Sequence, residues 1–300
     1  MEVSDLGAGP RPDAAARPAE AGLTRLVVPA PAKVNLFLHV TGRRADGYHT
    51  LESLFALIDW ADTIALDVRD DGAIVRANAL PGVPEDDDLT LRAARALRTH
   101  SGTRLGVTIA VEKSLPMGAG LGGGSSDAAS VLLALNRLWA LRLPRDELAA
   151  IGQSLGADVP FFVGGGPAVA RGTGDVLTPV SLPTLWLVLA LPRAHASTAA
   201  IFASPDLTRT TPSAKIDVFS EGYGHNDLES VAAAQFVEVA RAIAALKRAS
   251  ASARMTGSGS CAFAAFASEA GAHDAQRGLP RGLAARVVRT LPRHPLVAFA

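Results

Sequence analysis

A two-domain α+β fold is predicted by the length of the chain and by two patterns in its apolar residues. The chain has 300 residues, 48% of them hydrophobic and 19% charged, which is enough apolar material for more than one core. Segments with the two-residue period of strands and segments with helical spacing are mixed in the first part. The second part has the order βαββαβ of a ferredoxin-like domain. We expect a disordered extension at 1–22, an N-terminal α/β domain at 23–180 and a C-terminal ferredoxin-like domain at 181–300.

The individual elements follow from local patterns. Residues 1–22 are rich in Ala, Pro, Gly and Arg and lack the apolar segment of a secretory signal. Apolar and mixed positions alternate at 34–40, which predicts a strand on which Lys33 and Asn35 point the same way. Further strands are predicted at 63–68 and 105–112, and helices at 90–99, 127–141 and 144–155. The second part is predicted to hold a strand at 185–191, a long helix at 227–248, strands at 253–256 and 261–266, a helix at 268–277 and a strand at 284–291.

Composition excludes several classes of function. The 29 Lys and Arg residues balance 29 Asp and Glu residues, so no basic excess points to nucleic acid as a partner. The single cysteine, Cys261, cannot form an intramolecular disulfide, which is typical of the reducing cytoplasm. No apolar run reaches the length of about 18 residues that a membrane span needs. The seven histidines do not cluster as a zinc site requires, so no protein-bound metal site is predicted.

A glycine-rich turn at 116–127 is the strongest functional signal. Five of the seven residues from Gly118 to Gly124 are glycine, and each costs about 0.5–1 kcal/mol more to order than alanine. Close approach of the backbone to a ligand explains this cost, whereas a flexible solvent loop is the structural alternative. Ser125, Ser126 and Asp127 are suitable N-caps for the next helix, whose positive end would face an anion such as phosphate.

Three common phosphate loops do not fit this turn. Gly118, Gly120 and Gly123 match GxGxxG by count, but no second strand ending in an acid follows, as a dinucleotide site requires. No Gly-Lys pair occurs anywhere in the chain, which excludes a P-loop. The His-Arg-Asp and Asp-Phe-Gly motifs of protein kinases are also absent from the sequence.

Two charged residues need partners. Lys33 lies in an otherwise apolar strand, where an unpaired charge is unfavourable, unless it extends to solvent at the strand edge. Asp158 precedes the apolar run 159–162 and is either paired or a turn and capping residue. Pairing Lys33 with Asp158 would account for both.

Three other segments allow two interpretations each. Tyr48 and His49 are either surface-loop residues or a flat surface on which a nucleobase stacks. The second glycine-rich turn, at 256–260, is either a plain hairpin or a second wall of a phosphate site. The acidic run 85–88 is expected to be a solvated loop.

Taken together, the segments 31–36, 116–127 and 256–261 resemble, in the right order, the three motifs of the GHMP small-molecule kinases. The segments 44–51 and 156–160 and the lengthened glycine run at 122–124 are similar to the members that phosphorylate 4-diphosphocytidyl-2-C-methyl-D-erythritol. The resemblance covers about residues 28–266. It implies an N-terminal domain like domain 2 of ribosomal protein S5 and a ferredoxin-like C-terminal domain. The sequence leaves the oligomeric state open between monomer and homodimer.

By this resemblance, the chain is an ATP-dependent kinase that phosphorylates the 2-hydroxyl of that substrate in the non-mevalonate isoprenoid pathway, with Mg²⁺ bridging the phosphates. Asp158 would be the base and Lys33 its neighbour, while Asn35, Tyr48 and His49 would hold the cytidyl substrate. The residues implied at the ATP triphosphate are Pro116, Met117, Gly118, Ala119, Gly120, Leu121, Gly122, Gly123, Gly124, Ser125 and Ser126.

Two alternatives and one departure accompany this hypothesis. A GHMP kinase for homoserine, mevalonate or a sugar would not need the Tyr48–His49 segment, because those substrates have no base. A non-catalytic nucleotide-binding module would not need both Lys33 and Asp158. Asp88 stands where the family often has Asn in a loop near the nucleotide, so the family's base contacts at this position are not carried over to this chain.

Overall fold

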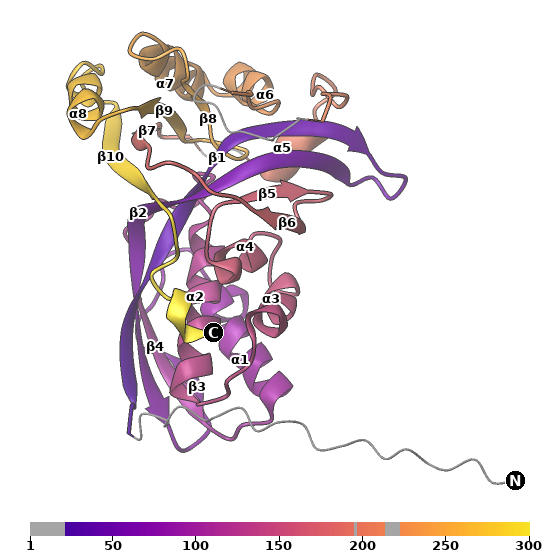
Figure 1. Ribbon diagram of the computed structural model, residues 1–300, viewed down its shortest axis with the longest axis vertical. Coiled ribbons are helices and arrows are strands. Elements are labelled where there is room, and N and C mark those ends of the chain that lie inside the picture. Colours follow the sequence, from indigo (N-terminus) through magenta and orange to yellow (C-terminus); the bar gives the residue numbers. More distant parts are fainter. Residues whose placement is uncertain (1–21, 195–196, 214–222) are drawn as a thin grey trace, which may run out of the picture.

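Two halves of mixed α and β structure share one continuous sheet (Figure 1). The computed structural model describes residues 22–194, 197–213 and 223–300. The extension predicted at 1–22 therefore lies, apart from Gly22, outside the described residues.

The N-terminal half has its helices packed on one face of the sheet (Figure 1). Its strands are β1 (Arg25–Arg43), β2 (His49–Arg69), β3 (Ile74–Arg76), β4 (Gly106–Glu112), β5 (Ala168–Arg171) and β6 (Val176–Pro179). Its helices are α1 (Leu89–Ser101), α2 (Gly123–Leu138), α3 (Arg145–Gln153) and α4 (Val159–Gly164), with a short 3-10 turn, η1 (Glu85–Asp87). These confirm the strands predicted at 34–40, 63–68 and 105–112 and the helices predicted at 90–99, 127–141 and 144–155, although α2 begins four residues early.

Strand β1 contributes residues to three hydrophobic cores of the described part of the chain. It pairs antiparallel with β2 along its whole length, with register shifts between Pro31 and Lys33 and between Asn35 and Phe37. Residues 30–40 are all buried, so both faces of the strand are covered rather than one. Ala30 belongs to the N-terminal core, Val34 to a central core and Val40 to the C-terminal core. The strand is therefore longer than the alternation predicted, because packing rather than local pattern sets its ends.

The C-terminal half has the predicted βαββαβ order. Its strands are β7 (Trp186–Leu191), β8 (Arg254–Met255), β9 (Ala262–Phe266) and β10 (Ala284–Leu291), and its helices are α5 (Thr198–Ala203), α6 (Glu229–Gln235), α7 (Val237–Lys247) and α8 (Glu269–Arg277). The strands lie in the order β10-β7-β9-β8 and pair antiparallel. This order is that of a ferredoxin-like sheet, covered here by α6, α7 and α8 (Figure 1).

The single helix predicted at 227–248 is wrong. The chain forms α6 and α7 with a break at Phe236, whose φ of −129° and ψ of 103° are extended. Phe236 packs against the C-terminal core in this conformation. Asp227 lies before the helix because its carboxylate accepts a hydrogen bond from the Val40 amide at 2.6 Å. Long-range contacts thus override a continuous helical pattern.

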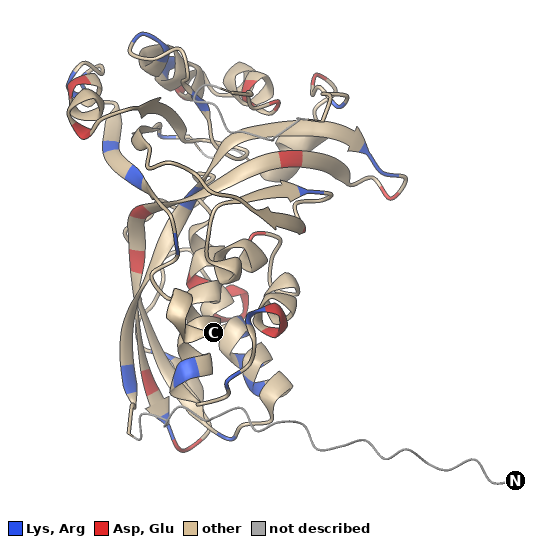
Figure 2. Cartoon of the chain, viewed as in Figure 1, with Lys and Arg blue, Asp and Glu red and all other residues tan. Residues whose placement is uncertain are grey.

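The two halves meet at β10 and at the C-terminus. Thr290 and Leu291 of β10 pair with Ile58 and Leu57 of β2, which joins the two sheets. After β10 the chain returns to the N-terminal half, where Arg145 donates hydrogen bonds to the carbonyls of Val297 and Ala300. Charged residues of both signs are distributed over both halves (Figure 2). Within the described residues, every helix is too short or too polar to cross a bilayer.

Candidate active site

The glycine-rich turn ends directly in the first turn of α2. The helix begins at Gly123 after Gly122, which has the left-handed φ of +70°. The capping role predicted for Ser125, Ser126 and Asp127 is therefore wrong. The hydroxyl of Ser126 donates instead to the Pro31 carbonyl at 2.6 Å. Because α2 starts within the glycine run, the N–H groups of its first turn that lack helical partners belong to the glycine-rich turn. There they can bind an anion.

Glycine is required where the turn packs against its neighbours. Gly120 has a φ of +77°, and a Cβ there would lie 2.6 Å from the carbonyl oxygen of Thr256. A Cβ on Gly122 would lie 3.0 Å from the Phe162 ring. The second glycine turn thus lies against the first, and Cys261, directly after it, donates to the Ala119 carbonyl at 3.3 Å. Of the two interpretations of residues 256–260, this packing favours the second wall.

Lys33 and Asp158 meet beside the turn, as the pairing hypothesis predicted. Nζ of Lys33 lies 3.5 Å from Oδ2 of Asp158, with side-chain exposures of 6% and 33%. Asp158 stands at the N-cap position of α4, but its side chain makes no capping hydrogen bond. The carboxylate is therefore left to face Lys33 and the adjacent cavity, which excludes the capping alternative. The ammonium also lies 4.8 Å from the centre of the Phe55 ring.

A buried hydrogen-bond network fixes Lys33 from the other side. Nζ of Lys33 donates to Oδ1 of Asn35 at 2.6 Å, and Nδ2 of Asn35 donates to the Ser53 hydroxyl at 2.8 Å. The Asn35 amide N–H donates to the Thr256 hydroxyl at 2.8 Å. Each polar group of the Asn35 side chain thus has a protein partner. Asn35 orients Lys33, and its contact with substrate stays a prediction.

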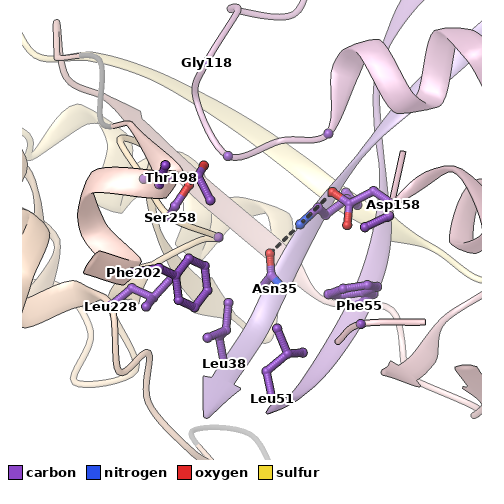
Figure 3. Close-up of a pocket in the computed structure, with 18 of the residues that line it drawn as sticks. Asn35, Leu38, Leu51, Phe55, Gly118, Asp158, Thr198, Phe202, Leu228 and Ser258 are labelled. Atoms are coloured by element: carbon purple, nitrogen blue, oxygen red, sulfur yellow. Dashed lines mark hydrogen bonds and ion pairs between the residues drawn. The ribbon is translucent and has the colours of Figure 1, made fainter. Parts of the chain in front are cut away.

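Two cavities open on opposite sides of the turn. The lysine pocket, of about 510 Å³, holds Lys33, Asn35 and Asp158 and reaches α5. In Figure 3 the dashed lines from Asn35 and Asp158 converge on the Lys33 ammonium, and Thr198, Phe202 and Ser258 line the facing wall. The glycine pocket, of about 630 Å³, is lined by residues 116–125, the start of α1 and Lys113. Gly118, Gly120 and Gly122 line both pockets, so the turn is their common wall.

Comparison with known proteins assigns this arrangement to a family. Residues 88–166 match the model of the GHMP kinases N terminal domain, and residues 215–285 match that of the GHMP kinases C terminal domain. A 4-diphosphocytidyl-2-C-methyl-D-erythritol kinase from Cupriavidus metallidurans is 57% identical over 277 residues, which is 91% of this chain and 95% of that protein. The chain belongs to the 4-diphosphocytidyl-2-C-methyl-D-erythritol kinase family of the GHMP kinases. The resemblance found in the sequence is thereby confirmed.

Solved structures agree with the GHMP kinase fold. The crystal structure of a 4-(cytidine 5'-diphospho)-2C-methyl-D-erythritol kinase superimposes with a TM-score of 0.77 at 34% identity, covering 88% of this chain and 99% of that one. A homoserine kinase from Cytophaga hutchinsonii has a TM-score of 0.64 at 16% identity, covering 92% and 97%. The second likeness shows the fold alone. The two-domain GHMP fold predicted from the sequence is therefore confirmed.

Tyr48 and His49 of this GHMP kinase lie on a third cavity. This histidine pocket, of about 550 Å³, is lined by Arg43, Asp46, Tyr48, His49 and part of α5. It shares Leu51, Thr173, Ala199 and Phe202 with the lysine pocket, so the two cavities adjoin. The His49 ring stacks on Phe202 with centroids 5.1 Å apart and planes inclined by 29°. Tyr48 is 68% exposed, which leaves its ring free to cover a ligand.

Asp88 is not part of a solvated loop, and the expectation for 85–88 is wrong at this position. It is 2% exposed and caps α1 by accepting hydrogen bonds from the amide and hydroxyl of Thr90 at 2.9 and 2.6 Å. Arg76 lies 3.3 Å from its second oxygen. The preceding acids form η1 and are exposed. Asp88 lines the glycine pocket, but both of its carboxylate oxygens are already used by Thr90 and Arg76.

Two carboxylates and one ammonium form a cluster at the edge of the glycine pocket, and Lys113 and Asp127 of this cluster line the pocket. Lys113 pairs with Asp62 and, at 2.7 Å, with Asp127. Oδ1 of Asp62 accepts hydrogen bonds from the amides of Ser114 and Leu115. Burial, opposed by Lys113 and reinforced by the charge of Asp62, raises the pKa of Asp127 to about 7. Burial lowers the pKa of Lys113, but the charges and hydrogen bonds of Asp127 and Asp62 outweigh it and raise that pKa.

Several residues at the pockets were not found from the sequence. Thr173 lies in the turn after β5, and Thr198 and Phe202 lie on the six-residue helix α5. Such short elements have too few residues to show a period. Lys113 is one of only four lysines, and this scarcity is the only feature of the sequence that singles it out as a candidate site residue.

Proposed function

We propose that this GHMP kinase transfers the γ-phosphoryl group of ATP to the 2-hydroxyl of 4-diphosphocytidyl-2-C-methyl-D-erythritol, a step of the non-mevalonate isoprenoid pathway. One observation carries the proposal: the Lys33–Asp158 pair lies in one cavity beside a glycine turn that also walls a second cavity. A phosphoryl donor and an acceptor bound on either side would meet at the turn. The names of the relatives at 50–57% identity specify the acceptor.

The glycine pocket fits ATP. Gly120 and Gly122 have left-handed φ angles, and a Cβ on them would lie 2.6 Å from the Thr256 carbonyl oxygen and 3.0 Å from the Phe162 ring. Because five of the seven residues 118–124 are glycine, the backbone of this turn can approach the triphosphate. The N-terminus of the 16-residue helix α2 supplies N–H groups and a positive dipole end. Leu80, Pro81 and Val83 line the same pocket and offer an apolar surface to the base.

Oxygen donors at the turn fit Mg²⁺. The Ser125 hydroxyl lies 3.6 Å from where a Cβ on Gly156 would stand, and thus close to the Asp158 turn. Oδ1 of Asp127 is buried and has no hydrogen-bond partner among the described residues. Hydroxyl and carboxylate oxygens together with phosphates are the ligands that Mg²⁺ prefers. When bound, the ion would neutralise charge on the phosphates.

The chain's own residues supply the proton transfer and the positioning. Asp158 accepts the proton of the acceptor hydroxyl, and its carboxylate is free to do so because it makes no capping bond. Lys33 holds that carboxylate in place and brings positive charge to the point where phosphoryl charge develops. Asn35 and Phe55 restrict the Lys33 ammonium, so this geometry is set before substrate binds.

The adjoining histidine pocket suits the cytidine end of the acceptor. The four residues that it shares with the lysine pocket connect the two cavities, so an elongated diphosphate ester can span both. Tyr48, His49 and Phe202 give aromatic surfaces for a base. A homoserine, mevalonate or sugar kinase would leave this pocket unused.

The test is ADP release by the purified chain with Mg-ATP and each of four acceptors: 4-diphosphocytidyl-2-C-methyl-D-erythritol, homoserine, mevalonate and galactose. We expect rapid ADP formation with the first alone. Turnover of another alcohol would support the proposed kinase activity but contradict the proposed acceptor. No turnover with any of the four, by folded protein that binds ATP, would favour a non-catalytic nucleotide-binding module.

A further inference from the structure

Asp158 is placed by the body of α4 rather than by a cap. It occupies the N-cap position without a capping hydrogen bond, and its ionic partner among the described residues is Lys33 at 3.5 Å. The location of this carboxylate therefore depends on where α4 as a whole lies. Because α4 has only six residues, its two ends are separated by fewer than about two helical turns. A displacement at one end should therefore reach the other.

The C-terminal end of α4 is held by Arg145. This residue begins α3, and its Nη1 donates to the carbonyl oxygen of Val163 in the last turn of α4. A carbonyl at this end of a helix has no partner within the helix, so a cation that donates to it satisfies an open acceptor at the negative end of the dipole. Among the described residues, the hydrogen bonds of the Arg145 guanidinium all go to main-chain oxygens.

The same guanidinium donates to the C-terminal segment that returns to the N-terminal half. Its Nη2 lies 2.6 Å from the carbonyl oxygen of Val297, the first residue of the 3-10 turn η2 (Val297–Phe299). The His294 amide donates to the carbonyl of Gly165, the C-cap of α4, at 2.8 Å. The C-terminal end of α4 thus lies between α3 and this segment, near the end of the chain marked in Figure 1.

The C-terminal segment is itself firmly attached. His294 is 1% exposed, and its Nδ1 accepts from the Leu296 amide at 3.1 Å. Leu296 belongs to the N-terminal core. The Phe299 ring lies 4.7 Å from the Arg137 guanidinium, and the Phe299 carbonyl accepts from Asn136 at 3.2 Å. The segment is therefore a fixed support for the guanidinium that holds α4.

Aromatic contacts hold the middle of α4. The Phe161 ring packs edge-to-face on Phe55 with centroids 5.1 Å apart, and the Phe162 ring lies 3.0 Å from where a Cβ on Gly122 would stand. These contacts leave the helix free to turn about its middle if its C-terminal end is released. Such a rotation would move the N-cap carboxylate most and the glycine turn least.

We propose that Arg145 is a positioning residue for phosphoryl transfer: by holding the C-terminal end of α4 against the C-terminal segment, it keeps the Asp158 carboxylate at the acceptor hydroxyl. This inference rests on the proposed function and deepens it. Arg145 lines neither the lysine pocket nor the glycine pocket, so both substrates should still bind when it is changed. A misplacement of about 1 Å at a reacting group can cost about 10²-fold in rate.

Steady-state kinetics of Arg145→Gln separates positioning from binding. We expect kcat to fall by about 10-fold, while KM for ATP and KM for the acceptor stay within about 3-fold. The matched control is Arg98→Gln, because Arg98 is also half-buried and its guanidinium also donates to a main-chain carbonyl, that of Gly72. It should keep the wild-type kcat. A kcat within about 2-fold of wild type for Arg145→Gln, or an equal fall in the control, would overturn the inference.

A double-mutant cycle tests whether Arg145 acts through Asp158. In the Asp158→Asn background, Arg145→Gln should change the residual kcat by less than about 2-fold, because the base that it positions is already gone. A merely structural role would instead lower kcat by the same factor in both backgrounds. That result, with thermal unfolding showing every variant folded at the assay temperature, would contradict the proposal.

Gly165→Ala disturbs the same contact without removing the guanidinium. Gly165 has a φ of +80°, and a Cβ there would lie 3.0 Å from Nη1 of Arg145. Its control is Gly282→Ala, at a φ of +92° where a Cβ would have no atom within 4 Å. Both variants carry a similar backbone strain, so only the displacement of Arg145 distinguishes them. We expect kcat to fall in Gly165→Ala alone, and equal kcat values would overturn the inference even if Arg145→Gln does not fold.

Amide hydrogen exchange of the peptide 157–166, followed by mass spectrometry, tests the structural part without turnover. We expect exchange in this peptide to be at least about 10-fold faster in Arg145→Gln than in wild type, and unchanged in Arg98→Gln. Unchanged exchange in Arg145→Gln would show that this residue does not hold α4. Absence of turnover by the wild-type chain would contradict the proposed function instead, and the exchange rates would still decide whether Arg145 holds the helix.

Discussion

The glycine pocket and the lysine pocket share a wall but are built in opposite ways. The glycine pocket contains the longer part of the glycine-rich turn, where a Cβ on Gly120 or Gly122 would collide with neighbouring atoms. The lysine pocket is formed by side chains whose polar atoms are connected in one network around Lys33. A backbone site is damaged by adding atoms, and a side-chain site is damaged by removing them. Substitutions on the two sides should therefore change different kinetic constants.

The largest expected effect is at Asp158. Asp158→Asn keeps the size of the side chain but removes the base, and we expect kcat to fall by about 10²–10⁴-fold. KM for ATP should change by less than about 3-fold, because ATP binds on the other side of the turn. Steady-state kinetics with both substrates varied measures this. A kcat within about 3-fold of wild type would remove Asp158 as the base.

The next effect is expected in the glycine pocket. Gly120→Ala introduces a Cβ 2.6 Å from the Thr256 carbonyl oxygen at a φ of +77°, where a non-glycine residue costs about 1–2 kcal/mol before any collision. We expect kcat/KM for ATP to fall by at least about 10-fold. The matched control is Gly278→Ala, at the end of α8 with a φ of −78°. If the two variants bind ATP equally well in a calorimetric titration, the backbone account of this pocket is wrong.

A smaller effect is expected where the acceptor's base would stack. Phe202→Ala removes the ring that lies against His49, and stacking on an aromatic side chain contributes about 1–3 kcal/mol per base. We expect KM for the cytidine substrate to rise by about 10-fold, while KM for ATP, the internal control, stays unchanged. An unchanged KM for the cytidine substrate would place its base elsewhere.

The smallest effect is on stability, behind the glycine pocket. Folding raises the pKa of Asp127 from 3.8 to about 7, so the folded state holds a proton that the unfolded state has released in that window. Raising the pH from about 4 to 7 therefore lowers the free energy of unfolding, by a few kcal/mol at most. Urea unfolding at pH 5 and 8 should show a steeper loss of stability with pH for wild type than for Asp127→Asn.

The exposed Asp274 provides the control for this comparison. Asp274 is 69% exposed on α8, so Asp274→Asn should keep the wild-type slope. The same slope in wild type and Asp127→Asn would show that burial does not raise the pKa of this carboxyl.

The sequence predicted the side-chain network around Lys33 more accurately than it predicted the backbone of the glycine-rich turn. The period of β1 places Lys33 and Asn35 on one side, and the cost of an unpaired charge led from Lys33 to Asp158. The start of α2 was misplaced because Ser126 and Asp127 suit a cap, yet they bond to Pro31 and Lys113 instead. Those partners are distant in sequence, and local preference cannot reveal them.

The wall opposite Lys33 could not be predicted for a different reason. Thr198 and Phe202 both lie on a helix of six residues. Neither position shows a period, a motif or a compositional signal. They reach the site only because α5 packs beside the β1–β2 hairpin, which is a property of the tertiary fold.

The most direct test of the account is a crystal structure with a non-hydrolysable ATP analogue and the cytidine substrate bound together. We predict the γ-phosphate against the turn at 118–124 and the 2-hydroxyl within hydrogen-bond distance, about 2.6–3.2 Å, of the Asp158 carboxylate. The two ligands would then occupy the glycine and lysine pockets. An acceptor hydroxyl bound away from Asp158, or a triphosphate bound away from the glycine turn, would contradict it.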